Sequence, residues 1–191
     1  RRKRQYQLSD DESWSLHVAR LMIGGKIQNY RNILKRYIRD YGENENINRA
    51  VQVLEHAKRE ALATQDKTTL IGYEGMASNA YFEVLPVLIL NQKADFPFHG
   101  RNRRPPKDAV NAMLSFAYTL IANDTSAALE TVGLDPYVGF LHTLRPGRTS
   151  LALDMMEELR AYLGDRFVLS LINKRQITSK DFLFQGDNGV V

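Results

Sequence analysis

The spacing of apolar residues along this 191-residue chain is that of α-helices almost throughout. The longest helical stretch begins at a capping aspartate, Asp10 or Asp11, and continues to about Tyr41, where Gly42 ends it. Its apolar stripe consists of Leu16, Ala19, Ile23, Ile27, Tyr30, Leu34, Tyr37 and Ile38. The same spacing predicts further helices at residues 47–64, 68–91, 105–123, 126–132, 150–163 and 166–174. We therefore expect an all-α fold, and the length fits a single domain over residues 1–191.

Three segments depart from this pattern. Residues 1–10 are basic and linker-like, and the tail at residues 181–191 is expected to be extended. Residues 92–104 contain proline, glycine and arginine and predict a loop. Its second half, residues 99–104, is basic and lacks an apolar anchor, so we expect this loop to be mobile.

The composition excludes several classes of protein. Without cysteine the chain has neither disulfides nor cysteine-based zinc sites, which fits a reducing cytosol, so a cytoplasmic protein is expected. No run of about 18 apolar residues is present, which argues against a membrane-spanning helix. The net charge of +4 is modest, but basic residues cluster at 1–4 and 101–107, and such clusters attract nucleic acid. A solvated surface would show the same clusters.

Glu74 is the only charged residue between Lys67 and Glu83. Its neighbours in sequence are apolar or small, so its carboxylate is predicted to be partly buried. A buried carboxylate is costly unless it is paired or binds a cation. Three interpretations stay open: a structural salt bridge with an arginine, a metal ligand, or an exposed position.

A second group of chemistry-bearing residues lies in the segment GLDPYVGFLHTLRPGRTSLALDMMEELR. His142 occupies a Gly/Pro-rich loop; imidazole is the commonest metal ligand, but a hydrogen-bonded structural histidine is the alternative. Asp154 and Glu157 share one face of the predicted helix. The opposite face, expected to contact the core, carries Ala152, Met156, Leu159 and Leu163. An amphipathic surface helix would look the same, so a solvated acidic face also stays open.

Three motifs in sequence order, EGMAS, RRPPKDAVNAMLSFAYTLI and GLDPYVGFLHTLRPGRTSLALDMMEELR, resemble the CRISPR-associated integrase, the spacer-acquisition endonuclease of microbial adaptive immunity. The segments GKIQNYRNILKR and RFVLSLINKRQI extend the resemblance over nearly the whole chain. The resemblance implies a catalytic Mn²⁺ or Mg²⁺ bound by Glu74, His142 and Glu157, with Asp154 as a further catalytic acid near the metal. It also implies that the chain is the C-terminal catalytic part of a longer protein, whose β-rich N-terminal domain is missing from this sequence.

The same resemblance implies a reaction and its partners. The 3′-hydroxyl of a foreign DNA fragment would attack a phosphodiester of the CRISPR repeat, which inserts the fragment as a spacer; with water as the nucleophile the enzyme is a nuclease. The expected partners are branched or partly duplex DNA, the repeat, a second copy of the chain in a homodimer, and a small ferredoxin-like adaptation protein.

Basic residues near these motifs are the predicted DNA contacts. They are Arg101, Arg103, Arg104, Lys107, Arg145, Arg148 and Arg160. A polar stripe, Asn111, Ser115 and Tyr118, either lines a cavity near the metal or bonds to backbone. The alternative function is a non-catalytic helical module that binds nucleic acid or protein, in which the acids are solvated and His142 is structural. A metal-dependent hydrolase of small phosphates is a third hypothesis, against which the basic loop argues weakly.

Overall fold

The computed structural model describes residues 1–186 and 189–190. The α-helices are α1 (Arg2–Asp10), α2 (Glu12–Tyr41), α3 (Glu45–Ala63), α4 (Lys67–Val84), α5 (Ala109–Thr131), α6 (Ser150–Leu159) and α7 (Arg166–Asn173). Short helical segments of other types are η1 (Leu85–Leu88), η2 (Arg160–Asp165) and η3 (Ser179–Asp181). No strand forms among the described residues, although an isolated β-bridge pairs Phe184 with Val190. The predicted all-α fold is confirmed.

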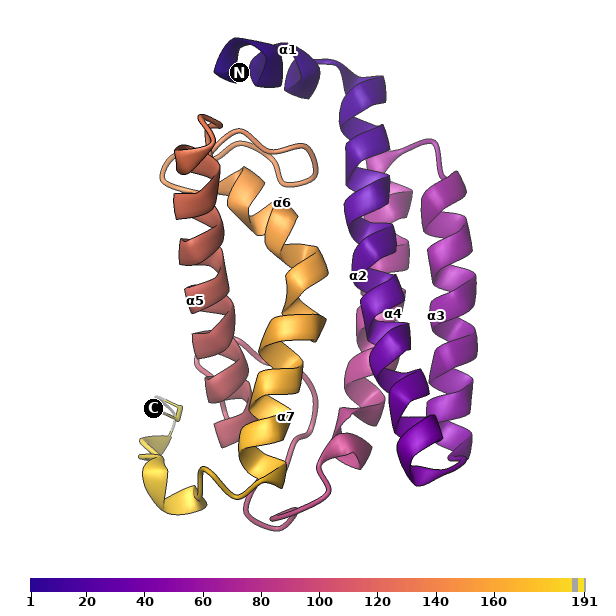
Figure 1. Cartoon of the computed structure of the whole chain (residues 1–191), viewed down its shortest axis with the longest axis vertical. Helices are drawn as coiled ribbons and strands as arrows, with labels where there is room; N and C mark the ends of the chain where they lie inside the picture. Colours follow the sequence, from indigo (N-terminus) through magenta and orange to yellow (C-terminus); the bar gives the residue numbers. More distant parts are fainter. Residues whose placement is uncertain (187–188, 191) are drawn as a thin grey trace.

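The helices form two layers that lie side by side (Figure 1). Helices α2, α3 and α4 make one layer, and α5, α6 and α7 make the other. Apolar side chains of both layers join one continuous core, in which the rings of Tyr30 and Tyr81 stack 3.9 Å apart. The first half of the chain thus supplies a three-helix platform, against which the second half positions its own functional residues.

Side-chain caps begin four of these helices where the sequence places an Asp or Asn. Asp11 accepts from the Trp14 amide at 3.0 Å, and Asn44 accepts from the Ile47 amide at 3.1 Å. Asp66 and Asp108 cap α4 and α5 in the same way. The longest helix, α2, thus begins after Asp11 and ends before Gly42, which confirms the start and end predicted for it.

The linker-like interpretation of residues 1–10 is wrong for their local structure, because they form α1. Gln5 anchors this helix: its side chain is buried and donates to the carbonyls of Asp135 and Val138 at 2.8 Å each. Tyr6 adds a hydrogen bond from its hydroxyl to Asp135 at 2.7 Å. The polar contacts lie on a distant loop, so apolar periodicity within residues 1–10 gives no sign of them.

Other helix ends differ from the prediction. The helix expected to reach Asn91 ends at Val84 and continues as the short η1, whose second residue is Pro86. The expected break near Asn123 is absent, since α5 runs from Ala109 to Thr131 without interruption. None of the described helices is both long enough and apolar enough to span a membrane.

The helix predicted over residues 150–163 changes type at Arg160, where the π-helical segment η2 begins. A π turn contains more residues than an α turn, so side chains beyond it change face. Leu163, expected in the core, lies beyond the start of this turn and is exposed, and Leu159, which precedes the turn, is exposed as well. Arg160 and Asp165 are buried instead.

Candidate active site

Helices α2, α4 and α6 meet around the side chain of Lys26, of which only 2% is exposed. Gly25 permits the approach of α6, because a Cβ there would lie 2.7 Å from the carboxyl carbon of Glu158. Asn29 fixes the same contact with a hydrogen bond to the Glu158 carbonyl at 2.8 Å. Gly25 is therefore a close-packing site against α6, the helix that carries Glu157.

The Lys26 ammonium group joins the two carboxylates that the sequence singled out. Its Nζ contacts Glu74 Oε1 and lies 2.7 Å from Glu157 Oε2. Arg160 Nη2 lies 2.9 Å from the other oxygen of Glu157. We call Lys26, Glu74, Glu157 and Arg160 the lysine cluster. Of the three interpretations of Glu74, the salt bridge is found, but with a lysine instead of an arginine.

Burial and charge act in opposite directions within the lysine cluster. Burial works to raise the pKa of Glu157, but the charges of Lys26 and Arg160, with a smaller effect of His142, hold that pKa below its ordinary value. Burial likewise opposes the charge of Lys26, yet Tyr30 and the carboxylates of Glu157 and Glu74 raise its pKa. Both groups are therefore ionised at neutral pH. The solvated acidic face is excluded for Glu157, which is 5% exposed.

His142 is held by Asp154. The imidazole Nδ1 lies 2.5 Å from Asp154 Oδ1, and Asp154 also accepts the backbone amides of Phe140, Leu141 and His142. A carboxylate at Nδ1 places the ring proton there and leaves Nε2 with a free lone pair. Gly139 is required at this turn, since a Cβ would lie 2.6 Å from Asp154 Oδ2.

Two carboxylates and an imidazole are ligands that suit Mn²⁺ or Mg²⁺. Within the part of the chain that the structure describes, no group of three or more His, Cys, Asp or Glu side chains lies close enough to hold a metal ion. Between Glu74 and Glu157 lies the ammonium group of Lys26, which contacts both. The donor types fit a divalent ion, and a cation already occupies the space between two of them.

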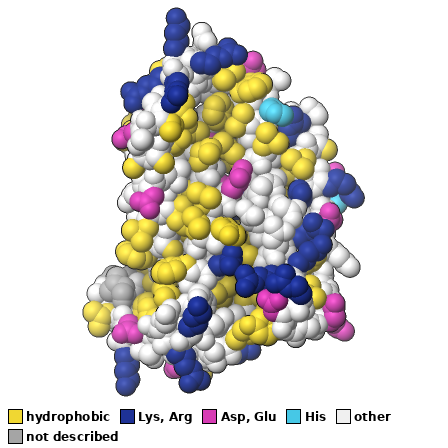
Figure 2. Space-filling model, viewed as in Figure 1, with side chains coloured by type: hydrophobic (Ala, Val, Ile, Leu, Met, Phe, Trp, Pro, Cys, Tyr) yellow, Lys and Arg dark blue, Asp and Glu magenta, His cyan; other side chains and the backbone are white. Residues whose placement is uncertain are grey.

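A cavity of about 260 Å³ adjoins the lysine cluster and is lined by four arginines from two parts of the chain. They are Arg101, Arg103, Arg104 and Arg160. The guanidinium groups of Arg101 and Arg160 lie 5.4 Å and 5.1 Å from the ring centre of Tyr118. Figure 2 shows a group of Lys and Arg side chains gathered below the middle of one face. Such a cavity suits a phosphate group.

The basic loop is anchored in its first half. The side chain of Asn111 accepts from Arg101 at 2.8 Å and from the Asn102 amide at 3.0 Å, and it donates to the Gly100 carbonyl. Arg101 also donates to Ser115 at 3.1 Å. Asn111 and Ser115 thus bind the loop. From the sequence alone, this polar stripe could equally have lined a cavity near the metal. Arg103 and Arg104, further along the loop, are exposed, and the mobility of the loop stays a prediction.

The remaining predicted DNA contacts are spread more widely. Arg145 and Arg148 lie on the loop of His142, the first exposed and the second half-buried. Lys107 is exposed, and its backbone amide donates to the Asn102 side chain at 2.7 Å. These three residues do not line the arginine cavity beside the lysine cluster.

One further buried acid, Asp165, was missed by the sequence analysis. Asp165 is fully buried, and its Oδ1 accepts a 2.5 Å hydrogen bond from the Tyr118 hydroxyl. We call Tyr81, Tyr118 and Asp165 the tyrosine cluster. Burial raises the pKa of Asp165 to about 6, although Tyr118, Tyr81 and Arg160 partly offset this effect.

Lys26 was missed as well, although the sequence contains a signal for it. Lys26 follows Ile23 by three residues and precedes Tyr30 by four, so it lies in the apolar stripe of its helix. A charged residue at such a position is buried and needs a partner.

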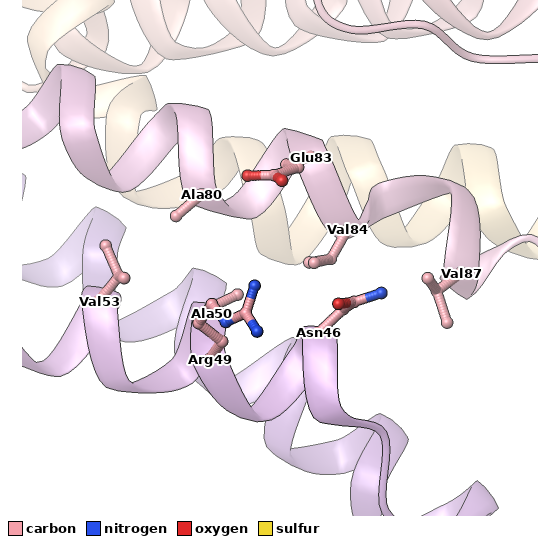
Figure 3. A pocket seen from close by; sticks show the side chains of 8 residues that line it. All are labelled: Asn46, Arg49, Ala50, Val53, Ala80, Glu83, Val84 and Val87. Atoms are coloured by element: carbon pink, nitrogen blue, oxygen red, sulfur yellow. The ribbon is translucent and has the colours of Figure 1, made fainter.

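Another pocket lies between α3 and α4, away from this site (Figure 3). Arg49 from α3 and Glu83 from α4 lie on its two sides. None of the predicted site residues lines this pocket. The candidate catalytic residues lie instead at and around the lysine cluster.

Solved structures share this helical arrangement. A CAS1 protein from Thermotoga maritima matches with a TM-score of 0.84 at 26% identity, over 100% of this chain and 57% of that one. A casposase bound to an integration product matches with a TM-score of 0.78 at 27% identity, over 97% of this chain and 53% of that one. The chain is therefore of the helical class found in CRISPR-associated and casposase proteins.

Sequence relatives narrow the class to a family. The CRISPR-associated endonuclease Cas1 of Leptospira interrogans is 45% identical over 185 residues, which are 95% of this chain and 72% of that protein. The corresponding protein of Chlorobaculum tepidum is 48% identical over 95% of this chain, which spans 54% of its length. The chain belongs to the family described as CRISPR associated protein Cas1, which it matches over residues 1–191.

Proposed function

We propose that this chain carries the active site of a divalent-metal-dependent DNA endonuclease and integrase that inserts foreign spacers into a CRISPR array. The observation that supports this most is the meeting of Glu74 and Glu157, from α4 and α6, at one buried cationic group. Burial raises the pKa of Glu157, Lys26 and Arg160 lower it, and His142 lies near enough to have a smaller influence on it. These are the three residues that the resemblance names as metal ligands.

In this proposal the ligands are Glu74, Glu157 and the Nε2 atom of His142. Asp154 orients the imidazole, because its carboxylate is occupied by Nδ1 and three backbone amides. Asp154 is thus the further acid of the site, acting on the ligand His142. A bound Mn²⁺ or Mg²⁺ would activate an attacking oxygen and neutralise charge on the phosphate.

The protein's own part in the reaction is to hold the DNA strand. Arg160 lies between Glu157 and the arginine cavity, so it can bind a phosphate oxygen beside the acids. Arg101 also lies over the Tyr118 ring and extends the cationic surface. Arg103 and Arg104 line the same cavity. Outside it, the DNA backbone would be followed by Lys107, Arg145 and Arg148. Such positioning is a large part of catalysis in phosphoryl transfer.

Relatives support DNA and a protein as partners, and the resemblance adds a second copy of the chain and a small ferredoxin-like protein. Two similar solved structures are a Cas6-RT-Cas1–Cas2 complex and a partial form of it, and the casposase structure contains an integration product. We infer DNA, a second copy of the chain and a small ferredoxin-like protein as partners here. The attacking group in integration is a 3′-hydroxyl of the captured fragment, and it is water in cleavage.

The non-catalytic alternative is weakened by the burial of the acids. A solvated face would expose Asp154 and Glu157, yet both are buried. The hydrogen bond of His142 to Asp154 fits a structural histidine as well as a ligand, so it does not separate the two functions. Measurements of metal binding and of DNA cleavage separate the catalytic function from the non-catalytic one.

The decisive experiment measures Mn²⁺ binding by calorimetry and cleavage of branched DNA with Mn²⁺. The variants Glu74→Ala, His142→Ala and Glu157→Ala are each expected to abolish cleavage and to weaken Mn²⁺ binding by more than about tenfold. The matched control is Glu83→Ala, an exposed acid on the same helix as Glu74. Full cleavage by any of the three variants, or equal loss in Glu83→Ala, would refute the proposed site.

A further inference from the structure

Lys26 has no part in the ligand set proposed above, yet it is the most buried charged member of the lysine cluster, with 2% of its surface exposed. Its ammonium group contacts Glu74 and lies 2.7 Å from Glu157. A buried lysine costs free energy unless its charge is paired. Its position therefore demands an explanation in terms of the two carboxylates.

The charges of the lysine cluster balance without a metal. Glu74 and Glu157 supply two negative charges, and Lys26 and Arg160 supply two positive ones. A divalent ion added to this arrangement would leave two excess positive charges in a buried space. Binding is therefore favoured if one of the two cationic side chains withdraws from the carboxylates.

Lys26 is better placed to withdraw than Arg160. The guanidinium of Arg160 is held by Glu157 at 2.9 Å and lies over the ring of Tyr118. Lys26 has a flexible unbranched stem, and its Nζ already lies 5.7 Å from the ring centre of Tyr30. The face of that ring offers the ammonium a cation–π contact when the carboxylates are engaged elsewhere.

We propose that Lys26 is an internal counter-cation: it holds Glu74 and Glu157 together in the metal-free protein, and a divalent ion displaces it. The inference rests on the proposed function, because it requires a metal at these acids. Lys26 is thus a positioning residue, which keeps two like charges assembled until the ion arrives. It also sets the affinity for the ion, since each binding event has to break its two ion pairs.

The test compares Mn²⁺ binding by the wild-type chain and by Lys26→Met, using calorimetry and the Mn²⁺-induced shift of Tm. Without metal, Lys26→Met is expected to have a lower Tm, because two carboxylates lose a partner. It is expected to bind Mn²⁺ roughly tenfold more tightly, because no ion pair has to be broken. Its Mn²⁺-induced rise in Tm is therefore larger than that of the wild type.

Two further variants keep the comparison decisive. Lys26→Gln retains a hydrogen-bond donor and replaces Lys26→Met if that variant does not fold. Lys58→Met is the matched control: its Nζ donates to Gln28 at 2.7 Å, and it contacts no residue of the lysine cluster. Removal of this second lysine is expected to leave Mn²⁺ affinity unchanged.

The outcomes separate this inference from the proposed function. If the wild type binds Mn²⁺ and His142→Ala does not, the site stands, and unchanged or weaker binding by both Lys26 variants overturns the displacement. Binding by the Lys26 variants alone would support displacement in its strongest form. If neither wild type nor variants bind Mn²⁺, the proposed function and the inference both fail.

Discussion

Glu157 and Asp165 are both buried acids of the second helical layer, but their pKa values are shifted in opposite directions. Glu157 lies in the lysine cluster, where Lys26 and Arg160 overcome the effect of burial and lower its pKa. Asp165 lies in the tyrosine cluster, where its direct contact is the Tyr118 hydroxyl, and burial raises its pKa to about 6. The same burial thus yields a fixed charge in one place and a titrating group in the other.

The difference shows what each cluster is suited to do. A carboxylate that is kept ionised by removable cations can exchange them for another cation, as a metal ligand must. A carboxylate whose hydrogen-bond partner is a neutral hydroxyl tolerates protonation and serves packing and orientation. Asp154 is a third case, because four N–H groups satisfy it without any mobile cation. Of these three acids, only Glu157 is both ionised and paired with cations that another cation can replace.

The largest expected effect comes from breaking the lysine cluster. Glu157→Ala leaves Lys26 and Arg160 buried with one carboxylate fewer, so we expect a loss of roughly 3–5 kcal/mol in the free energy of unfolding. Replacing the pair together, as Lys26→Met with Glu157→Leu, is expected to recover most of this loss. Urea unfolding at neutral pH measures both.

The control for this prediction is an ion pair with an exposed acid. Glu55, with 56% of its side chain exposed, pairs with Arg31, whose side chain is 20% exposed, and Glu55→Ala is expected to cost less than about 1 kcal/mol. If Glu157→Ala costs no more than Glu55→Ala, the lysine cluster does not stabilise the fold as described.

A smaller effect of opposite sign is expected in the tyrosine cluster. In the unfolded chain Asp165 ionises near pH 3.8, whereas burial raises its pKa in the folded chain to about 6. Between these values the folded state holds a proton that the unfolded state has lost, so Asp165 lowers stability as pH rises through this window. Asp165→Asn is therefore expected to be more stable than wild type by up to roughly 3 kcal/mol above pH 6, and equal to it near pH 4.

Unfolding at several pH values tests this sign. The stability difference between Asp165→Asn and wild type should grow from about pH 4 to about pH 6 and then stay constant. Asp124→Asn, an exposed acid on α5, should show no such trend. A variant that is less stable than wild type at neutral pH would mean that the Asp165 carboxylate is ionised and stabilising, which contradicts the comparison drawn above.

The Asp154 arrangement predicts an intermediate effect at Gly139. A Cβ there would lie 2.6 Å from Asp154 Oδ2 and 2.9 Å from the Ser150 carbonyl carbon. Gly139→Ala is expected to cost about 1–3 kcal/mol and to weaken Mn²⁺ binding, because the loop that carries His142 has to shift. Gly75→Ala on α4 is the control: its Cβ would meet nothing within 4 Å, and it should stabilise its helix by roughly 1 kcal/mol. Equal effects at the two glycines would refute the proposed role of the turn.

The sequence predicts the helices well and the clusters poorly, for a physical reason. Periodicity reports which face of a helix is apolar, and that sufficed for the all-α fold and for α2 with its Asp11 cap. The partners of Lys26 come from α4 and α6, which are far away along the chain, so spacing cannot reveal them. The π turn that begins at Arg160 changes which side chains beyond it are buried, and no local sequence pattern predicts this turn. The metal ligands themselves came from a resemblance, and they stay a prediction.

The smallest effect on stability, and the one most specific to DNA, is expected at the exposed end of the basic loop. Arg103 and Arg104 line the arginine cavity, and both are exposed. Replacing both with Gln should change the free energy of unfolding by less than about 0.5 kcal/mol, since neither takes part in the buried clusters. It should lower the slope of log K against log salt for DNA binding by about one for each lost phosphate contact.

The control is Arg39→Gln, which replaces an exposed arginine at the end of α2. If the salt slope is the same in all three proteins, the loop does not contact the backbone. The cationic function would then rest on Arg101 and Arg160, the two arginines that the interior already holds against Tyr118.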